Sequence, residues 1–384
     1  MSGVDAIGGF MLSRKKATKR YLDHCLRNIV NQSPPLLTVP KQFNPSIALA
    51  CLKKDKVSNL FFYWLKQHAI PHPLHDPLKK NHLFFLRHHL LLKHELIRLT
   101  EKLRLNNTPY AILKGIPLEM QLHSNPAARI SSDIDLLIDQ KHLIATHHVL
   151  KHMGYQLKSV IGEQQLTQCF NLIIEVGKDL TYLHPKKPIR IELHWKQTIM
   201  SAHGLPALST LALSPQHSLS ILAPEENFVY LCQHAAQHYW ERKQWLIDIA
   251  LFYQKYPLVW EHVIEIAQKK HGTRPLLEAA NLLASEFSME INPIKSHLSD
   301  QIVVKFRLLV TKALWRTNQR LPHPLLVILN MFIYQSLLNK YRYLSHLLLH
   351  REKSMSQLKK KPHRSKLMLF FFSFFQTEPK SSQK

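Results

Sequence analysis

The sequence predicts an α/β fold in which a sheet is embedded in a largely helical protein. Short aliphatic runs with the period of strands gather between residues 106 and 200. Residues 16–100 and 276–350, on either side, have apolar residues at helical spacing. With 384 residues and 45% hydrophobic composition, the chain can form two or three domains or layers. We expect a helical N-terminal region (1–105), an α/β core (106–200), a helical C-terminal region (201–350) and a basic, Phe-rich tail (351–384).

The N-terminal region is expected to form amphipathic helices. Residues 48–52, 57–65 and 82–100 have apolar side chains on one helical face and polar ones on the other. A proline cluster at 71–77 separates the second segment from the third, because proline lacks the N–H that a helix interior requires. We see no catalytic constellation in this region.

The core begins with a strand followed by a helix. Tyr110–Gly115 is a short aliphatic run that ends in glycine, and residues 116–123 then have helical character. Backbone N–H groups at the start of a helix bind anions, and Lys114 beside them adds positive charge for a triphosphate. A solvated lysine and a turn glycine are the simpler interpretation of the same residues.

Two aspartates, Asp133 and Asp135, stand one residue apart in the aliphatic run 129–139. In a β-strand both carboxylates lie on one face, while Ile134 and Leu136 point into a core. Two like charges in an apolar setting are unfavourable unless a cation neutralises them. Paired oxygens without sulfur suit a hard divalent ion such as Mg²⁺.

A third carboxylate follows on a later strand. Residues 142–153 are expected to form a helix that ends at Gly154, and residues 170–176 are a strand candidate. Residues 188–195 alternate clearly and place Glu192 on the same face as Arg190 and His194. A lone glutamate in a strand is usually solvated, but its position after an Asp-x-Asp strand favours a role in a site.

Glycine-rich phosphate loops are absent from the sequence. Neither G-x-x-x-x-G-K-[ST] nor G-x-G-x-x-G occurs, which argues against ordinary P-loop and Rossmann enzymes. The formal charge of +25 lies in the flanks: residues 1–100 hold 16 basic and 5 acidic residues, residues 301–384 hold 16 and 2, and residues 101–300 hold 19 of each. Such flanks attract RNA or an anionic membrane surface, but a lysine-rich solvated surface explains them equally well.

The cysteines and the apolar segments predict a cytoplasmic protein. The four cysteines are far apart and form no C-x-x-C pair, as is typical of reduced proteins. We find neither the order of a secretory signal nor an apolar run long enough for a membrane span. A basic cluster at 359–366 precedes the Phe-rich run 367–375, which could lie at the periphery of the inner membrane or dock back onto the protein.

Three motifs of the core resemble the uncharacterised bacterial nucleotidyltransferase family of the DNA polymerase β-like superfamily. They are Leu113-Lys114-Gly115, Asp133-Ile-Asp-Leu-Leu137 preceded by Arg129, and Ile191-Glu-Leu-His-Trp195. Residues 231–240 and 245–250 are similar to helical segments of the same family, so the resemblance covers roughly residues 45–290. It implies a polymerase β-like mixed sheet flanked by helices, with the Asp-x-Asp on one strand and the third acid on an adjacent one.

The resemblance also implies a reaction, the transfer of NMP from an NTP to a hydroxyl of an unidentified acceptor with release of pyrophosphate. Asp133, Asp135 and Glu192 would bind two Mg²⁺ ions, with Mn²⁺ as the alternative metal. The residues expected to contact the NTP are Lys114, Gly115, Arg129, Ser132 and His194. Arg129 would clamp phosphate with its planar guanidinium, or else form a salt bridge to one of the aspartates.

Two other interpretations remain open. The first is a non-catalytic nucleic-acid-binding or partner-binding protein on a degenerate nucleotidyltransferase scaffold, and the second is a membrane-surface helper that relies on the Phe-rich tail. His234 and His238 lie four residues apart on one helical face, but the segment lacks the glutamate of zinc proteases. We expect these histidines to pack or to hydrogen-bond, to Asp248 or to the substrate.

Overall fold

Seven strands form one mixed sheet in the described part of the chain. The computed structural model describes residues 3–34, 38–158, 174, 177–199, 201–202, 204–291, 298–317, 323–334, 339–341 and 343–344. The strands are β1 (Tyr110–Ile112), β2 (Ile134–Ile138), β3 (Gln156–Leu157), β4 (Asp179–Leu183), β5 (Arg190–His194), β6 (Leu208–Ser214) and β7 (His217–Leu222). Their order in the sheet is β3-β4-β5-β2-β1-β7-β6, so β2 lies at the centre. The predicted α/β fold is confirmed.

Helices surround the sheet. They are α1 (Gly3–Val30), α2 (Pro45–Lys54), α3 (Ser58–Gln67), α4 (His75–Leu105), α5 (Ile116–Leu122), α6 (Leu143–His152), α9 (Pro224–Gln237), α10 (Lys243–Lys255), α11 (Trp260–Lys269), α12 (Thr273–Phe287), α13 (Leu298–Thr317) and α14 (His323–Asn330). The three helices expected before residue 105 are present as α2, α3 and α4, and α6 ends before Gly154, whose φ is +89°. No described helix is both long enough and apolar enough to cross a bilayer.

The pairing of the central strands places the acidic residues side by side. β2 pairs with β5 in parallel and with β1 in antiparallel orientation, and β1 pairs in parallel with β7. In the β2–β5 register Asp135 is the partner of Glu192. Neighbouring strands lie about 4.8 Å apart, so the two carboxylates are held close together by the backbone alone.

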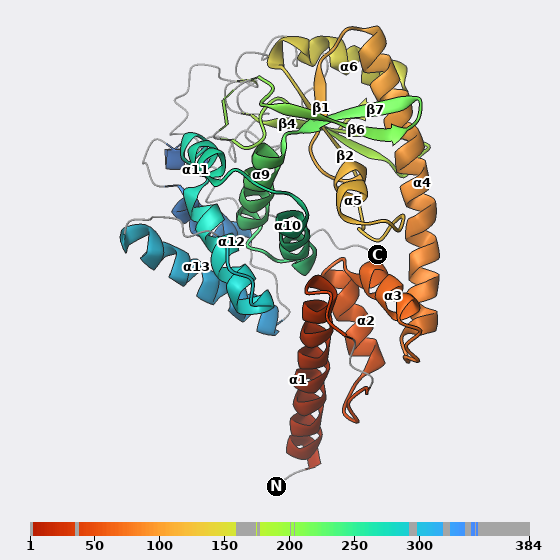
Figure 1. Cartoon of the computed structure of the whole chain (residues 1–384), viewed down its shortest axis with the longest axis vertical. Coiled ribbons are helices and arrows are strands. Elements are labelled where there is room, and N and C mark those ends of the chain that lie inside the picture. The colour runs from red at the N-terminus through yellow and green to blue at the C-terminus, as the bar shows by residue number, and fades with distance from the viewer. Residues whose placement is uncertain are drawn as a thin grey trace.

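The two faces of the sheet pack against different helices. Leu136, Ile191 and Leu193 are buried in a core that also contains residues of α4 and α6, whereas Ala111 and Leu137 belong to the core formed with α9 and α10. Figure 1 shows the sheet nearly edge-on, with α6 above it and α9 and α10 below. Because side chains alternate along a strand, the face that carries Leu137 also carries Asp135. The acidic residues therefore point toward α9 rather than toward α6.

The sheet extends beyond residue 200, where we expected a helical region to begin. β6 and β7 form a hairpin, and β7 pairs with β1. Their signal in the sequence is weak because β6 lies at the edge of the sheet, where most of its side chains are exposed or half-buried and need not be apolar. Apart from Ile174, the strand expected over 170–176 lies outside the described residues, as does the tail 351–384.

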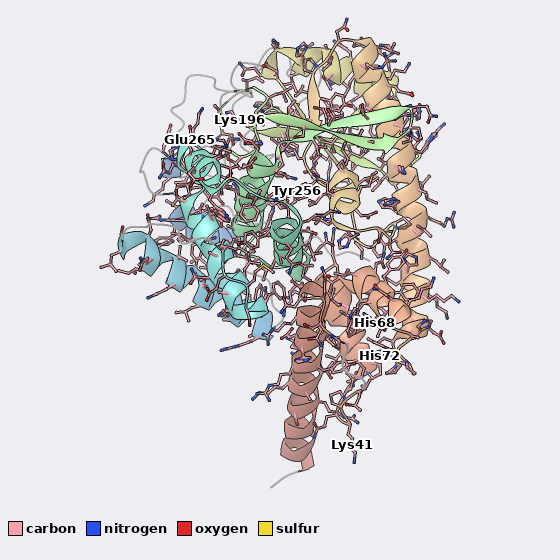
Figure 2. The ribbon with its side chains drawn as sticks, in the orientation of Figure 1. Lys41, His68, His72, Lys196, Tyr256 and Glu265 are labelled. Carbon is pink, nitrogen blue, oxygen red and sulfur yellow. The ribbon has the colours of Figure 1, made fainter. Side chains whose placement is uncertain are left out.

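His72, labelled in Figure 2, packs among aromatic side chains of the N-terminal region. Its ring stacks on Tyr21 at 5.9 Å between centroids and meets Phe43 and Phe61 edge-on at 5.4 and 5.7 Å. The Nδ1 atom accepts a hydrogen bond from the backbone N–H of Leu74. Burial lowers the pKa of His72 to about 4, so the ring is neutral at neutral pH.

His72 makes the stability of the protein sensitive to acid. In the folded protein the pKa of His72 lies below its usual value of 6.5, so between these two pKa values the unfolded protein binds more protons. The free energy of unfolding therefore falls as the pH drops from 6.5 toward 4. The variant His72→Asn keeps an acceptor for the Leu74 N–H but does not titrate. We expect it to be about 1–3 kcal/mol less stable at pH 7, because ring packing is lost. Urea unfolding at several pH values should show this difference shrinking toward pH 4, and a constant difference would contradict the assignment.

Candidate active site

One pocket of about 300 Å³ contains every site residue predicted from the sequence. They are Lys114, Gly115, Arg129, Ser132, Asp133, Asp135, Glu192 and His194. The sheet contributes one wall through β2 and β5, and α9 and the start of α10 contribute another. The pocket therefore lies between the sheet and the helices that follow it in the chain.

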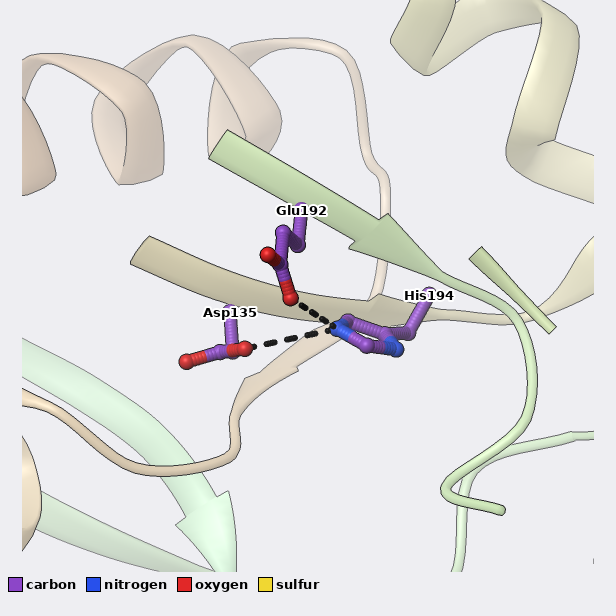
Figure 3. Close-up of side chains that lie close together, drawn as sticks. All are labelled: Asp135, Glu192 and His194. Carbon is purple, nitrogen blue, oxygen red and sulfur yellow. Dashed lines mark ion pairs between the residues drawn. The ribbon is translucent and has the colours of Figure 1, made fainter. Parts of the chain in front are cut away.

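Asp135, Glu192 and His194 form a compact cluster, drawn in Figure 3. One ligand atom from each lies within 4.8 Å of the others. His194 Nε2 is 3.4 Å from Asp135 Oδ1 and 3.7 Å from Glu192 Oε2. Glu192 and His194 share a face of β5 because they are two residues apart, and the parallel register brings Asp135 beside them.

Asp135 is fully buried, and its negative charge is balanced by the positive charge of Lys114. Lys114 Nζ lies 2.9 Å from Asp135 Oδ1. Burial by itself would raise the pKa of Asp135, but Lys114 and His194 outweigh it and hold that pKa well below its usual range. In the same way burial would lower the pKa of Lys114, but Asp135 and the nearby carboxylates of Asp133 and Glu192 raise it above its usual value. Both side chains therefore remain charged at neutral pH.

The cluster has the donor atoms of a divalent-cation site. Lys114 contacts Oδ1 of Asp135, whereas Oδ2 is buried and has no hydrogen-bond partner among the described residues, so its lone pairs are available to a cation. The other ring nitrogen of His194, Nδ1, lies 3.6 Å from Asp179 Oδ2, and a carboxylate in this position orients an imidazole toward a metal. Two carboxylates and one imidazole fit a divalent ion.

Asp133 shares the pocket but not the cluster. Its carboxylate forms an ion pair with Arg190, whose Nε also lies 3.4 Å from Glu192 Oε1. β2 begins at Ile134, so Asp133 belongs to the loop before the strand. Arg190 is absent from the residues predicted for the site, although the alternation of β5 places it on the same face as Glu192.

Arg129 has a partner that neither sequence interpretation identified. It is buried, and its Nε and Nη2 atoms both lie 2.9 Å from Asp248 Oδ2 on α10. Its Nη1 donates to Ser131 Oγ at 3.0 Å. The salt bridge expected to Asp133 or Asp135 is therefore wrong, because the guanidinium points across the pocket toward α10. The phosphate contact of Arg129 stays a prediction.

His234 of α9 and His238, which directly follows this helix, line the wall of the pocket opposite the sheet. His234 and His238 lie 4.9 Å apart between ring centroids, and each ring also contacts Trp245. Burial and the charge of Lys114 lower the pKa of His238 to about 3, so this imidazole is neutral. The metal-ligand cluster found among the described residues contains neither histidine. Both rings pack against Trp245, and Asp248 pairs with Arg129 instead of with them; a contact of these histidines with the substrate stays a prediction.

Three cations of the pocket were not among the residues predicted from the sequence: Lys56, Lys178 and Arg242. Lys56 Nζ donates to Ser132 Oγ at 3.3 Å. Burial, followed by the charge of Arg242, lowers the pKa of Lys56 to about 8. Nothing in their local sequence marks these residues, since only the folded chain brings the end of α2 and the start of α10 to the pocket.

A protein family with the description "Uncharacterised nucleotidyltransferase" matches residues 41–288 of the chain. The match covers more than half of the chain and contains every residue of the pocket. No curated protein matches the chain.

Gly115, between β1 and α5, has a backbone conformation that favours glycine. Its φ of +79° and ψ of −130° are unfavourable for any residue with a side chain, and a Cβ there would lie 3.5 Å from the backbone oxygen of Asp133. We expect Gly115→Ala to lower the free energy of unfolding by about 1–3 kcal/mol. Ser132→Ala, which removes only one long hydrogen bond in the same loop, should change it by less than about 0.5 kcal/mol. Equal stabilities of the two variants in urea would contradict this account.

Proposed function

The chain belongs to the uncharacterised nucleotidyltransferase family, and we propose that it transfers a nucleoside monophosphate from an NTP to a hydroxyl of an acceptor, releasing pyrophosphate. The observation that carries the proposal is the convergence of Asp135, Glu192 and His194 in a pocket rich in lysine and arginine. A protein that only bound a partner would have no need to bury Asp135 at the cost of a compensating lysine.

The acidic cluster would hold the divalent metal. Asp135 and Glu192 supply oxygen ligands and His194 supplies a nitrogen. A bound Mg²⁺ or Mn²⁺ would neutralise phosphate charge and lower the pKa of the attacking hydroxyl. The imidazole must be neutral to act as a ligand, although the carboxylates of Asp135 and Glu192, opposing burial, raise the pKa of His194. Metal binding and loss of this proton would therefore occur together.

The cations of the pocket would hold the triphosphate. Lys56, Lys114, Lys178, Arg190 and Arg242 all line it, and their side chains come from five different segments of the chain. A guanidinium binds two phosphate oxygens at once, and a lysine supplies a compact charge. A volume of about 300 Å³ is within the range of small-molecule sites. Gly115 would allow the phosphates to approach the backbone closely.

Asp133 would become a metal ligand when phosphate takes its place beside Arg190. In the structure Asp133 and Arg190 neutralise each other. A phosphate oxygen is an equally good partner for the guanidinium, and its arrival would free the carboxylate of Asp133. This exchange reconciles the two-ion site implied by the family with a cluster that lacks Asp133, and it makes the second ion dependent on the nucleotide.

Substitution of the cluster should abolish both metal binding and transfer. We expect Glu192→Gln to reduce labelling of acceptors in a cell extract by at least about 100-fold, measured with α-³²P-labelled NTPs and Mg²⁺ or Mn²⁺. Electron paramagnetic resonance should show weaker binding of Mn²⁺ to the same variant. Asp135→Asn should have the same two effects, but it also leaves Lys114 buried without a partner and costs about 3–5 kcal/mol of stability.

The matched control is Glu241→Gln, since Glu241 lines the same pocket but lies outside the cluster. It should keep Mn²⁺ affinity within about twofold of the wild type. Normal labelling and normal Mn²⁺ binding by Glu192→Gln would refute the proposal.

A further inference from the structure

We propose that a second pocket, next to the candidate active site, binds the phosphodiester backbone of a single-stranded nucleic acid. The acceptor hydroxyl would then be the one at the end of that strand. The role as acceptor rests on the function proposed above, whereas the binding of nucleic acid does not.

The second pocket has a volume of about 1110 Å³ and lies among α1, α2, α10 and α13. Eight of its lining residues are lysine or arginine and three are acidic. Sites for drug-sized molecules typically have about 300–1,000 Å³, so this pocket is large for a single metabolite. A strongly basic concavity of this size suits a chain of phosphates.

Most of these cations form no ion pair in the part of the chain that the structure describes. Lys243 pairs with Asp23, and Lys19 Nζ donates to the backbone oxygens of Trp315 and Arg316. The other six form no ion pair with a carboxylate in the described part of the chain: Lys15, Lys16, Arg20, Lys54, Lys312 and Arg316. Burial and then the charges of Lys15 and Lys54 lower the pKa of Lys19, which shows how closely the positive charges gather. A polyanion would relieve this repulsion.

The pocket also contains an aromatic side chain that is fixed in place. Trp315 Nε1 donates to the backbone oxygen of Trp240 at 2.7 Å, and Lys243 Nζ lies 5.3 Å from the centre of its ring. Its helix, α13, is anchored by Arg307, which is fully buried and forms an ion pair with Glu278 of α12. Basic grooves with aromatic side chains are typical of proteins that bind single-stranded nucleic acid.

The two pockets are neighbours, because at two places in the chain consecutive residues line different pockets. Asp55 lines the basic pocket and Lys56 the candidate active site, and Lys243 and Arg242 are divided in the same way. The two stretches are joined by a hydrogen bond from the backbone N–H of Gln244 to the backbone oxygen of Asp55, at 3.2 Å. Consecutive Cα atoms are about 3.8 Å apart, so the linings of the two pockets meet at these residues.

The lining argues for nucleic acid rather than for a membrane surface. Membrane-surface sites combine basic residues with exposed apolar side chains that enter the lipid. The leucines of this pocket, Leu22, Leu26 and Leu52, are buried and belong to the core, and its aromatic residue, Trp315, is partly buried against the same core. A flat bilayer cannot enter a concavity, but a flexible chain of phosphates can.

The experiment measures binding of a 5′-fluorescein-labelled, 12-nucleotide single-stranded RNA by fluorescence anisotropy between about 50 and 200 mM KCl. We expect Lys16→Gln/Lys54→Gln/Arg316→Gln to weaken binding at least about 10-fold at the lowest salt. Each neutralised phosphate contributes about 0.7 to the slope of log affinity against log salt, so the slope should fall by about 2. A DNA oligonucleotide of the same sequence shows whether the 2′-hydroxyl contributes.

The control triple variant, Lys79→Gln/Arg87→Gln/Lys102→Gln, makes the same change of charge on exposed residues of α4. It should stay within about twofold of the wild type. Lys16→Arg/Lys54→Arg, which keeps the charge, should also bind normally, and so should Glu192→Gln even if it loses all transferase activity. Loss of transfer with intact RNA binding would thus separate failure of the catalytic proposal from failure of this one.

Three results would overturn the proposal: no binding of RNA or DNA by the wild type, equal losses in the two triple variants, or unchanged RNA binding in the pocket variant. If vesicles containing phosphatidylglycerol co-sediment with the wild type but not with the pocket variant, and RNA binding is unaffected, the pocket is a membrane site instead.

Discussion

The buried ion pair between Lys114 and Asp135 is the constraint on which the site depends. Asp135 lies on the central strand, where a carboxylate has no access to water, and Lys114 follows the adjacent strand β1. Removing one partner of such a pair typically costs about 3–5 kcal/mol, so each residue requires the other. Replacing such a pair by well-packed apolar residues is often neutral or stabilising, so stability alone does not require the pair. The retained charge is consistent with the divalent-metal site proposed above.

The pairing of strands in the sheet brings the residues of the acidic cluster together. Parallel pairing of β2 with β5 places Glu192 beside Asp135, and the period of two brings His194 to the same face. The opposite face of these strands is filled with aliphatic side chains that pack against α4 and α6. A shift of β5 by one residue would bury Glu192 in that core and expose its leucines, so the register is strongly fixed. The geometry of the cluster follows from the packing of the whole sheet.

The sequence predicted the central part of the fold and of the site, since both depend on local patterns. Alternation along β5 identified Glu192 and His194, and a short aliphatic run ending in glycine identified β1 and Gly115. Contacts between distant segments could not be predicted in the same way. Arg129 pairs with Asp248, 119 positions away, and Lys56 enters the pocket from the end of α2. The hairpin of β6 and β7 escaped notice because an edge strand with few buried side chains lacks a clear hydrophobic period.

The basic flanks of the sequence meet at one place in the folded protein. Residues 101–300 carry equal numbers of basic and acidic residues, and the candidate active site, most of which they form, contains both cations and carboxylates. The excess of positive charge lies in the two flanks, and the structure brings parts of both together, since α1 and α13 line the same basic pocket. A merely solvated basic surface would spread these side chains apart, because like charges repel. If the proposed transfer takes place, the convergence of these positive charges beside the candidate active site would guide an anionic acceptor toward it by long-range attraction.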